Sequence, residues 1–125
     1  MGERPIGVCI EDLLFVSRIR EAARSAGCTI VFLSADSPDV VSQLTQTNPG
    51  LILVDLALQR IDPVEWIRNI HARVPQTPVI AFGAHVREDL LREAAAAGCS
   101  KVLTRSKFVQ ELLPMMTEYR ASQGS

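Results

Sequence analysis

Three acidic residues at two points of the chain have the type and position to do chemistry. Asp55 is the only acidic side chain in the most apolar stretch of the sequence, residues 51–58 (LILVDLAL). Glu11 and Asp12 directly follow a second apolar segment, residues 6–10. A lone carboxylate among apolar side chains is costly to bury unless it is paired, protonated or bound to a metal. Asp55 is therefore the first candidate for a functional residue.

The elements that must position these acids are short strands that alternate with helices. Apolar segments predict strands at residues 6–10, 29–33, 51–54, 79–82 and 102–104. Patterns with a helical period occupy residues 13–26, 38–47 and 87–97, and also begin near residues 63 and 107. Strands that are apolar along their whole length are typical of a parallel sheet covered on both faces. We expect an α/β fold, a doubly wound five-stranded parallel sheet in the order 2-1-3-4-5 with helices on both faces.

Residues that begin and end helices support these ranges. Ser37 is placed to cap the second helix, and Asp62-Pro63 supplies a cap and a first-turn proline for the third. Gly98 follows the fourth helix, where a glycine commonly ends a helix. Pro114 lies inside the last helical pattern, so we expect it to kink or split that helix.

The expected strand order places a ligand crevice between the carboxyl ends of strands one and three. Glu11 and Asp12 come just after strand one, and Asp55 ends strand three, so the three carboxylates would converge there. Carboxylates held together repel one another unless a cation neutralises them. Mg²⁺ suits this position, because it binds one or two carboxylates, keeps several waters and leaves room for a phosphoryl group. The sequence therefore predicts a magnesium site.

Each acid also has a purely structural interpretation. Glu11 and Asp12 would suit caps of the first helix, and Asp55 a hydrogen-bonded acid at a strand end. For Asp12 alone, the capping role is the better interpretation. The presence of all three acids at these strand ends favours a binding site.

Composition argues against several classes of protein. The 13 basic and 14 acidic side chains give a net charge of −1 and are spread along the chain, so no basic stripe favours direct nucleic-acid binding. No apolar run approaches the ~20 residues of a membrane span. The three cysteines are far apart and fit reduced thiols better than disulfides, so we expect a cytoplasmic protein.

Other kinds of site find little support. The first strand is followed by Glu-Asp-Leu-Leu, which lacks the glycines of a dinucleotide-binding or P-loop motif. His71 and His85 have no partner ligands at a fixed spacing, so neither indicates zinc. We expect His71 on a helix surface and His85 in a solvated loop.

Nearly the whole chain, residues 5–119, resembles the receiver domain of two-component response regulators. The resemblance rests on the acidic pair Glu11-Asp12 and on Asp55, which stands at the phosphoacceptor position. It continues through three segments, DLALQRIDP (55–63), PVIAF (78–82) and AGCS (97–100). The resemblance implies a flavodoxin-like doubly wound fold, in agreement with the strand order expected above.

The resemblance also implies a reaction. Asp55 would accept a phosphoryl group from a histidine kinase or a phosphotransfer protein. A Mg²⁺ ion would be held by Asp12, Asp55 and the backbone carbonyl of Ala57, with Glu11 binding through water. Such a metal-held carboxylate is a sensible nucleophile, because phosphoryl transfer depends mainly on position and charge.

The same resemblance places phosphate sensing at Gly83, Ala84 and Arg105, where the chain departs from the family pattern. Gly83 stands where the family has a Ser or Thr hydroxyl, so it offers only its backbone N–H to a phosphoryl oxygen. Arg105-Ser106 replaces the usual Lys-Pro, which keeps a cation that can pair with phosphate or with the acceptor carboxylate. Val102 replaces the aromatic residue that moves with the hydroxyl.

We therefore expect residues 1–120 to form a single receiver domain, followed by a short polar tail at residues 121–125. The domain would take up phosphate and signal through protein association. Its downstream partner would dock on the face formed by residues 87–97, residues 102–104 and the last helix. We expect no enzymatic activity beyond the domain's own phosphorylation and dephosphorylation.

Two other functions compete with this one. The alternative is a phosphorylation-independent interaction module, a pseudo-receiver, in which Asp55 and Arg105 form a static ion pair. A small magnesium-dependent hydrolase is less favoured, because the sequence offers no additional general acid or base beside the acidic trio.

Overall fold

The computed structural model describes residues 3–34 and 40–123, which form a single sheet with flanking helices. Every strand pair is parallel and the order is β2-β1-β3-β4-β5, which confirms the predicted α/β architecture. The strands are β1 (Ile6–Cys9), β2 (Ile30–Phe32), β3 (Leu51–Asp55), β4 (Val79–Gly83) and β5 (Lys101–Thr104). The helices are α1 (Leu13–Ala26), α2 (Val40–Thr47), α3 (Pro63–Arg73), α4 (Glu88–Ala96) and α5 (Arg105–Gln123).

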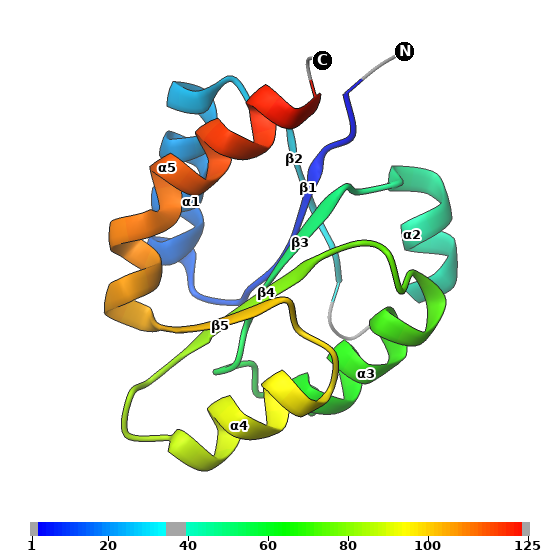
Figure 1. The fold of residues 1–125 in the computed structure, drawn as a ribbon, viewed down its shortest axis with the longest axis vertical. Coiled ribbons are helices and arrows are strands. Elements are labelled where there is room, and N and C mark those ends of the chain that lie inside the picture. Colours follow the sequence, from blue (N-terminus) through cyan, green and yellow to red (C-terminus); the bar gives the residue numbers. More distant parts are fainter. Residues whose placement is uncertain (1–2, 35–39, 124–125) are drawn as a thin grey trace.

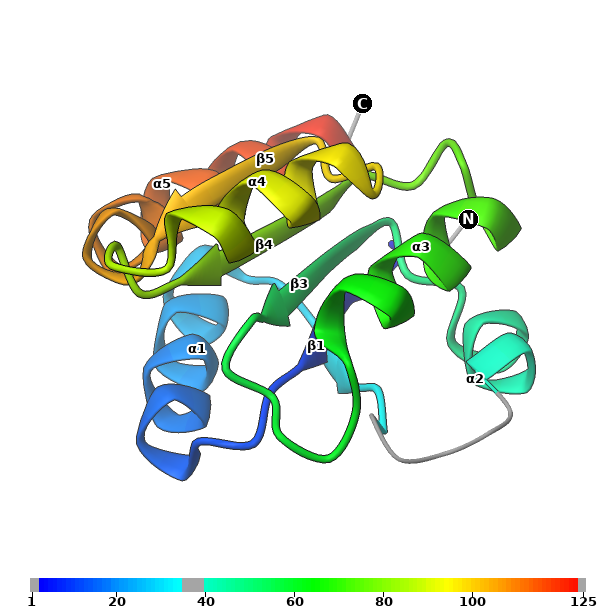
Figure 2. The same ribbon diagram turned by 90° about the horizontal axis from the view of Figure 1, so that it is seen from below.

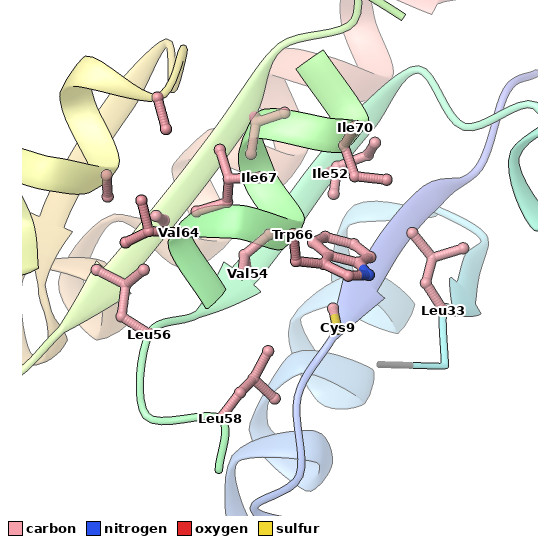
Figure 3. Packing of buried hydrophobic residues seen from close by; sticks show 14 of the residues in the cluster. Cys9, Leu33, Ile52, Val54, Leu56, Leu58, Val64, Trp66, Ile67 and Ile70 are labelled. Carbon is pink, nitrogen blue, oxygen red and sulfur yellow. The ribbon is translucent and has the colours of Figure 1, made fainter. Parts of the chain in front are cut away.

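Helices cover both faces of the sheet (Figure 1, Figure 2). On one face, buried residues of α1 and α5 pack against alternate residues of β1, β3 and β4. On the other face, α2, α3 and α4 supply the buried side chains, and Figure 3 shows part of this second core around Trp66 of α3. β1, β3 and β4 are consequently buried at every residue, which is why Asp55, at the end of β3, is the only charged side chain in these three strands.

The predicted start of α3 is confirmed in detail. Asp62 caps the helix, with its Oδ1 accepting hydrogen bonds from the N–H groups of Val64 (3.0 Å) and Glu65 (3.3 Å). Pro63 occupies the first turn, where a missing N–H costs nothing. Ser37, the expected cap of α2, lies outside the described residues.

The last helix differs from its prediction at both ends. It begins at Arg105, immediately after β5, where the Thr104 hydroxyl accepts a hydrogen bond from the Lys107 N–H at 3.3 Å. It continues without a break past Pro114 as far as Gln123, so the helix is not split and the first residues of the expected tail are helical. Burial of three side chains on both sides of the proline, Phe108, Leu112 and Met116, holds the two halves against one sheet. None of the helices in the described part of the chain is long and apolar enough to cross a membrane.

The sheet register brings the predicted acids to one edge. β1 and β3 are neighbours with Cys9 opposite Val54, so Asp55 and the residues that follow Cys9 lie at the same end of the sheet. On its other side, Asp55 lies opposite Phe82 of β4. The carboxyl ends of β1, β3 and β4 therefore frame the site.

His71 is not the simple surface residue that the sequence indicates. Its imidazole is half-buried and packs over Gly98, where an added Cβ would lie 2.5 Å from His71 Cγ. Gly98 also has a φ of +119°, a backbone conformation that L side chains rarely adopt. Only glycine suits this position, for both reasons.

Gly98→Ala is expected to lower the free energy of unfolding by roughly 1–3 kcal/mol. Alanine is strained at a positive φ, and its methyl group would also clash with His71. Gly27→Ala is the matched control, since Gly27 also has a positive φ (+76°) but its nearest side-chain atom would be 3.8 Å from the new Cβ. Urea unfolding measures both variants. If Gly98→Ala and Gly27→Ala lost the same free energy of unfolding, crowding by His71 would not contribute to the effect at position 98.

Candidate functional site

Asp55 is the buried centre of the site, with only 2% of its surface exposed. Its Oδ1 accepts hydrogen bonds from the Ala57 N–H and from Arg105 Nη2, both at 2.9 Å. Burial raises the pKa of Asp55 above its ordinary value, whereas the Ala57 N–H and Arg105 lower the pKa and the nearby charge of Asp12 raises it further. Asp55 is thus a buried carboxylate whose charge is only partly compensated.

Asp12 caps α1, as the structural interpretation expected. Its Oδ1 accepts hydrogen bonds from the N–H groups of Leu14 (2.9 Å) and Phe15 (3.4 Å). The same carboxylate is close enough to Asp55 to act on it electrostatically. Asp12 can therefore cap α1 and also contribute its charge to the acidic site.

Glu11 has a different role from the cap that the sequence allowed. Its Oε1 accepts a hydrogen bond from the Gln59 N–H at 3.1 Å, and its Oε2 lies 4.0 Å from Arg60 Nε. Both partners belong to the loop that follows β3. Glu11 therefore ties that loop to the end of β1, next to the acceptor position.

Arg105 forms an ion pair with Asp55. The Nη2–Oδ1 distance is 2.9 Å, and the Arg105 side chain is 33% exposed against 3% for Asp55. The guanidinium carbon lies 4.9 Å from the ring centroid of Phe15 and 5.5 Å from that of Phe82. The ion pair predicted as an alternative is therefore present, and it rests on aromatic rings.

These rings belong to an aromatic cluster of three residues from three elements, Phe15 of α1, Phe82 of β4 and Phe108 of α5. The ring centroids are 5.2 Å apart for Phe15–Phe82, 5.9 Å for Phe15–Phe108 and 3.9 Å for Phe82–Phe108. Sequence patterns identified these residues only as apolar members of separate elements. No local signal shows that they meet beneath a cation, because their contacts join distant parts of the chain.

Gly83 ends β4 in a crowded position. An added Cβ would lie 3.2 Å from both Cβ and Cδ1 of Leu56 and 3.5 Å from Leu91 Cδ2. The close approach of Leu56, the residue after Asp55, therefore favours glycine here. Ala84, the next residue, is exposed.

Val102, which stands at the family's aromatic position, is half-buried in β5. It packs against the core on the α2, α3 and α4 face of the sheet. The aromatic cluster lies on the opposite face, with α1 and α5. Val102 is thus a core aliphatic residue on the other side of the sheet from the aromatic cluster.

A cleft of about 1020 Å³ opens beside the ion pair. Its walls come from α1, the loop after β4 and the beginning of α5, through Asp12, Leu14, Phe15, Arg18, Ala84, His85, Thr104, Arg105 and Ser106 among others. His85 is exposed, as expected for a loop residue, and lies at this cleft. Arg105 therefore lines the cleft and contacts Asp55 at the same time.

The donor types at this edge fit Mg²⁺, although the carboxylates already hold other partners. Among residues 3–34 and 40–123, no three His, Cys, Asp or Glu side chains lie together as a ready metal cluster. Mg²⁺ commonly takes only one or two carboxylates and completes its shell with water, so Asp12 and Asp55 provide enough acidic donors. The nearby charge of Asp12 raises the pKa of Asp55, and a bound cation would offset this repulsion.

Sequence comparisons connect this site to known proteins. The family model for the response regulator receiver domain matches residues 8–117. The transcriptional activator protein ExaE of Pseudomonas putida is 31% identical over 68 residues, which are 54% of this chain and 32% of that protein. The Regulator of RpoS of Escherichia coli (strain K12) is 28% identical over 95 residues, 76% of this chain and 28% of that protein. Among the curated relatives compared, the chain spans from 24% to 54% of the relative's length.

Solved structures agree on the fold. A response regulator receiver domain protein (CheY-like) from Methanospirillum hungatei JF-1 superposes with a TM-score of 0.79, covering 98% of each chain at 15% identity. At this identity the likeness concerns the arrangement of strands and helices. The roles of individual residues rest on the geometry described above.

The raised pKa of Asp55 has a consequence for stability. Between the unfolded value, near 3.8, and the higher folded value, the folded protein binds more protons than the unfolded protein. Stability therefore falls as pH rises through this window. Asp55→Asn is expected to lack this fall, so its stability relative to wild type increases across the window.

Urea midpoints measured from about pH 3 to pH 7 test this expectation. Arg105→Gln is a useful companion, because loss of the cation that lowers the Asp55 pKa should widen the window. Parallel stability curves for wild type and Asp55→Asn would show that Asp55 is not titrating as the structure indicates.

Proposed function

The chain belongs to the response regulator receiver domain family, and we propose that it accepts a phosphoryl group on Asp55 and signals by protein association. One observation carries this proposal. A buried carboxylate ends β3 at the sheet's carboxyl edge, with a guanidinium at 2.9 Å and a second acid close enough to repel it. Ligand sites of open α/β sheets lie at this edge.

The proposed reaction is a transfer from a phosphohistidine. An Asp55 oxygen forms the new bond to phosphorus while the donor's N–P bond breaks, and the leaving imidazole nitrogen keeps that electron pair. The reaction requires little chemistry from the protein beyond position and charge. Burial supports the reactivity of Asp55, because few waters compete for its oxygens.

Mg²⁺ would supply positive charge to the carboxylates and the phosphoryl group. Asp12, Asp55 and the Ala57 carbonyl would hold the ion, and Glu11 would bind it through water. Arg105 would exchange Asp55 Oδ1 for a phosphoryl oxygen, a geometry that guanidinium groups favour. The backbone N–H groups of Gly83 and Ala84 would face the same oxygens. Within this proposal, phosphate sensing depends on the backbone and on one arginine.

Partners follow from the same proposal. The phosphoryl donor would be a histidine kinase or a phosphotransfer protein, and a downstream protein would dock on the face of α4, β5 and α5. The named relatives include a transcriptional activator and the Regulator of RpoS, both longer than the matched segment. We propose no enzymatic activity for this domain beyond its own phosphorylation and dephosphorylation, and a cytoplasmic location in keeping with its free cysteines.

The phosphorylation-independent interaction module remains the second candidate. The Asp55–Arg105 ion pair favours it, since this pair already supplies a cation to the acceptor without phosphate. Gly83 and Val102 favour it too, because neither can move as the family's hydroxyl and aromatic residues do. The two candidates differ in one measurable property, which is covalent phosphorylation.

Incubation with acetyl phosphate and Mg²⁺ is expected to add the mass of one phosphoryl group to the wild-type protein. Asp55→Asn should reduce the adduct to background, because no other carboxylate is buried at this edge among the described residues. Asp62→Asn is the matched control, as asparagine keeps a capping oxygen for α3 away from the site. Intact-protein mass spectrometry reads the result.

An Asp55→Asn protein phosphorylated at the wild-type level would overturn the acceptor assignment. An unmodified wild type that also fails to respond to Mg²⁺ and beryllofluoride at Asp12, Asp55 and Gly83 in amide NMR spectra would support the interaction module instead.

Gly83→Thr is expected to strengthen the conformational response to beryllofluoride, because it restores a hydroxyl at the end of β4. The substitution should also cost stability, since Leu56 must move to admit the new Cβ. Amide chemical-shift changes that extend to Val102 and α4 measure the response, and urea unfolding measures the cost. A response confined to the wild-type set of amides would contradict this account of the switch.

A further inference from the structure

Arg105 is held at the site from two directions. Its Nη2 contacts Asp55 Oδ1 at 2.9 Å, and its guanidinium carbon lies 4.9 Å from the centroid of the Phe15 ring. Phe82 adds a second ring at 5.5 Å. These contacts restrict the flexible Arg105 side chain, at the start of α5, to one region next to Asp55.

Phe15 is itself rigidly placed. Its ring is 8% exposed and stacks with Phe82 and Phe108, whose side chains are almost fully buried. Its N–H donates to Oδ1 of the cap residue Asp12, which fixes the first turn of α1. The ring is therefore set by the core and by the helix cap, independently of Arg105.

An arginine uses such a ring differently from a lysine. The planar guanidinium can lie against an aromatic face and still point an N–H at a carboxylate or a phosphoryl oxygen. An ammonium group is a compact point charge that lacks this planar fit. An arginine at position 105 therefore makes use of the Phe15 ring in a way that a lysine would not.

We propose that Phe15 is a positioning residue, whose ring holds the Arg105 guanidinium in place for Asp55 and for an incoming phosphoryl group. Phe15 acts through Arg105 and touches neither the acceptor nor the phosphoryl group. The phosphoryl part of this inference rests on the proposed function. The placement of Arg105 over the ring does not, and it can be measured in the unphosphorylated protein.

The direct measurement is the Arg105 Nε–H signal in a ¹H–¹⁵N NMR spectrum. In the wild type, the ring current of Phe15 should shift this proton upfield of the Nε–H signals of arginines other than Arg20, which also lies over a ring. Phe15→Leu should remove most of the shift and leave the smaller contribution of Phe82, whereas Phe15→Tyr, which keeps the ring, should retain it. An unshifted Arg105 signal in the wild type, which needs no substitution, would overturn the inference.

The functional measurement is beryllofluoride affinity in the presence of Mg²⁺, followed by ¹⁹F NMR. Phe15→Leu is expected to weaken binding roughly two- to thirtyfold, the range of cation–π effects from exposed to desolvated sites. In an Arg105→Gln background, the same substitution should cause no further loss, because Phe15 acts only through Arg105. A loss that simply adds in the double variant would show a general structural effect and contradict positioning.

The chain contains a matched control. Arg20 lies over the ring of Phe32 at 4.9 Å, the same distance as in the Arg105–Phe15 pair, but on α1 and β2 away from the acceptor cleft. Phe32→Leu should leave both the Arg105 signal and beryllofluoride affinity unchanged. If wild type fails to bind beryllofluoride while the Arg105 signal is shifted, the proposed function fails and the positioning of Arg105 stands.

Discussion

The burial of one carboxylate constrains everything around it. Asp55 lies at the end of a strand whose residues are all buried, so its charge cannot be solvated as it would be in water. The protein offers it a backbone N–H from Ala57 and the guanidinium of Arg105, while the second acid, Asp12, works against these contacts. Because the compensation is incomplete, a further positive charge near Asp55 would stabilise its ionised form.

The Asp55–Arg105 pair illustrates why a buried ion pair is weak evidence for stability. Desolvation of Asp55 offsets much of its attraction to the partly exposed Arg105, so the pair adds little net stability. Here the pair is set on Phe15 and Phe82, and these rings are continuous with the core between the sheet, α1 and α5. The stacked rings thus form a continuous packed contact from Arg105 to Phe108 of α5, on the face opposite Val102.

The departures from the family pattern form a physically consistent set. Gly83 gives space to Leu56, whose side chain closes the core immediately after the acceptor. A side chain at position 83 would compete for that space, so loss of the hydroxyl and packing of Leu56 belong together. Val102 fills the core where an aromatic residue would otherwise move. In the proposed function, phosphate sensing would therefore depend mainly on Arg105, whose guanidinium can exchange one oxygen partner for another.

The sequence by itself determined the order and type of the elements, because apolar periodicity and helix caps such as Asp62 act locally. It also determined that the acids meet at one sheet edge, since parallel strands place their carboxyl ends together. Sequence reasoning also reached the capping of α1 by Asp12 and the pairing of Asp55 with Arg105. Tertiary structure alone decided that Glu11 contacts the loop after β3 and that Arg105 rests on the rings of Phe15 and Phe82. It also decided that α5 passes through its proline, because burial on both sides outweighs one missing backbone hydrogen bond. Such contacts join residues far apart in the chain, so no local pattern encodes them.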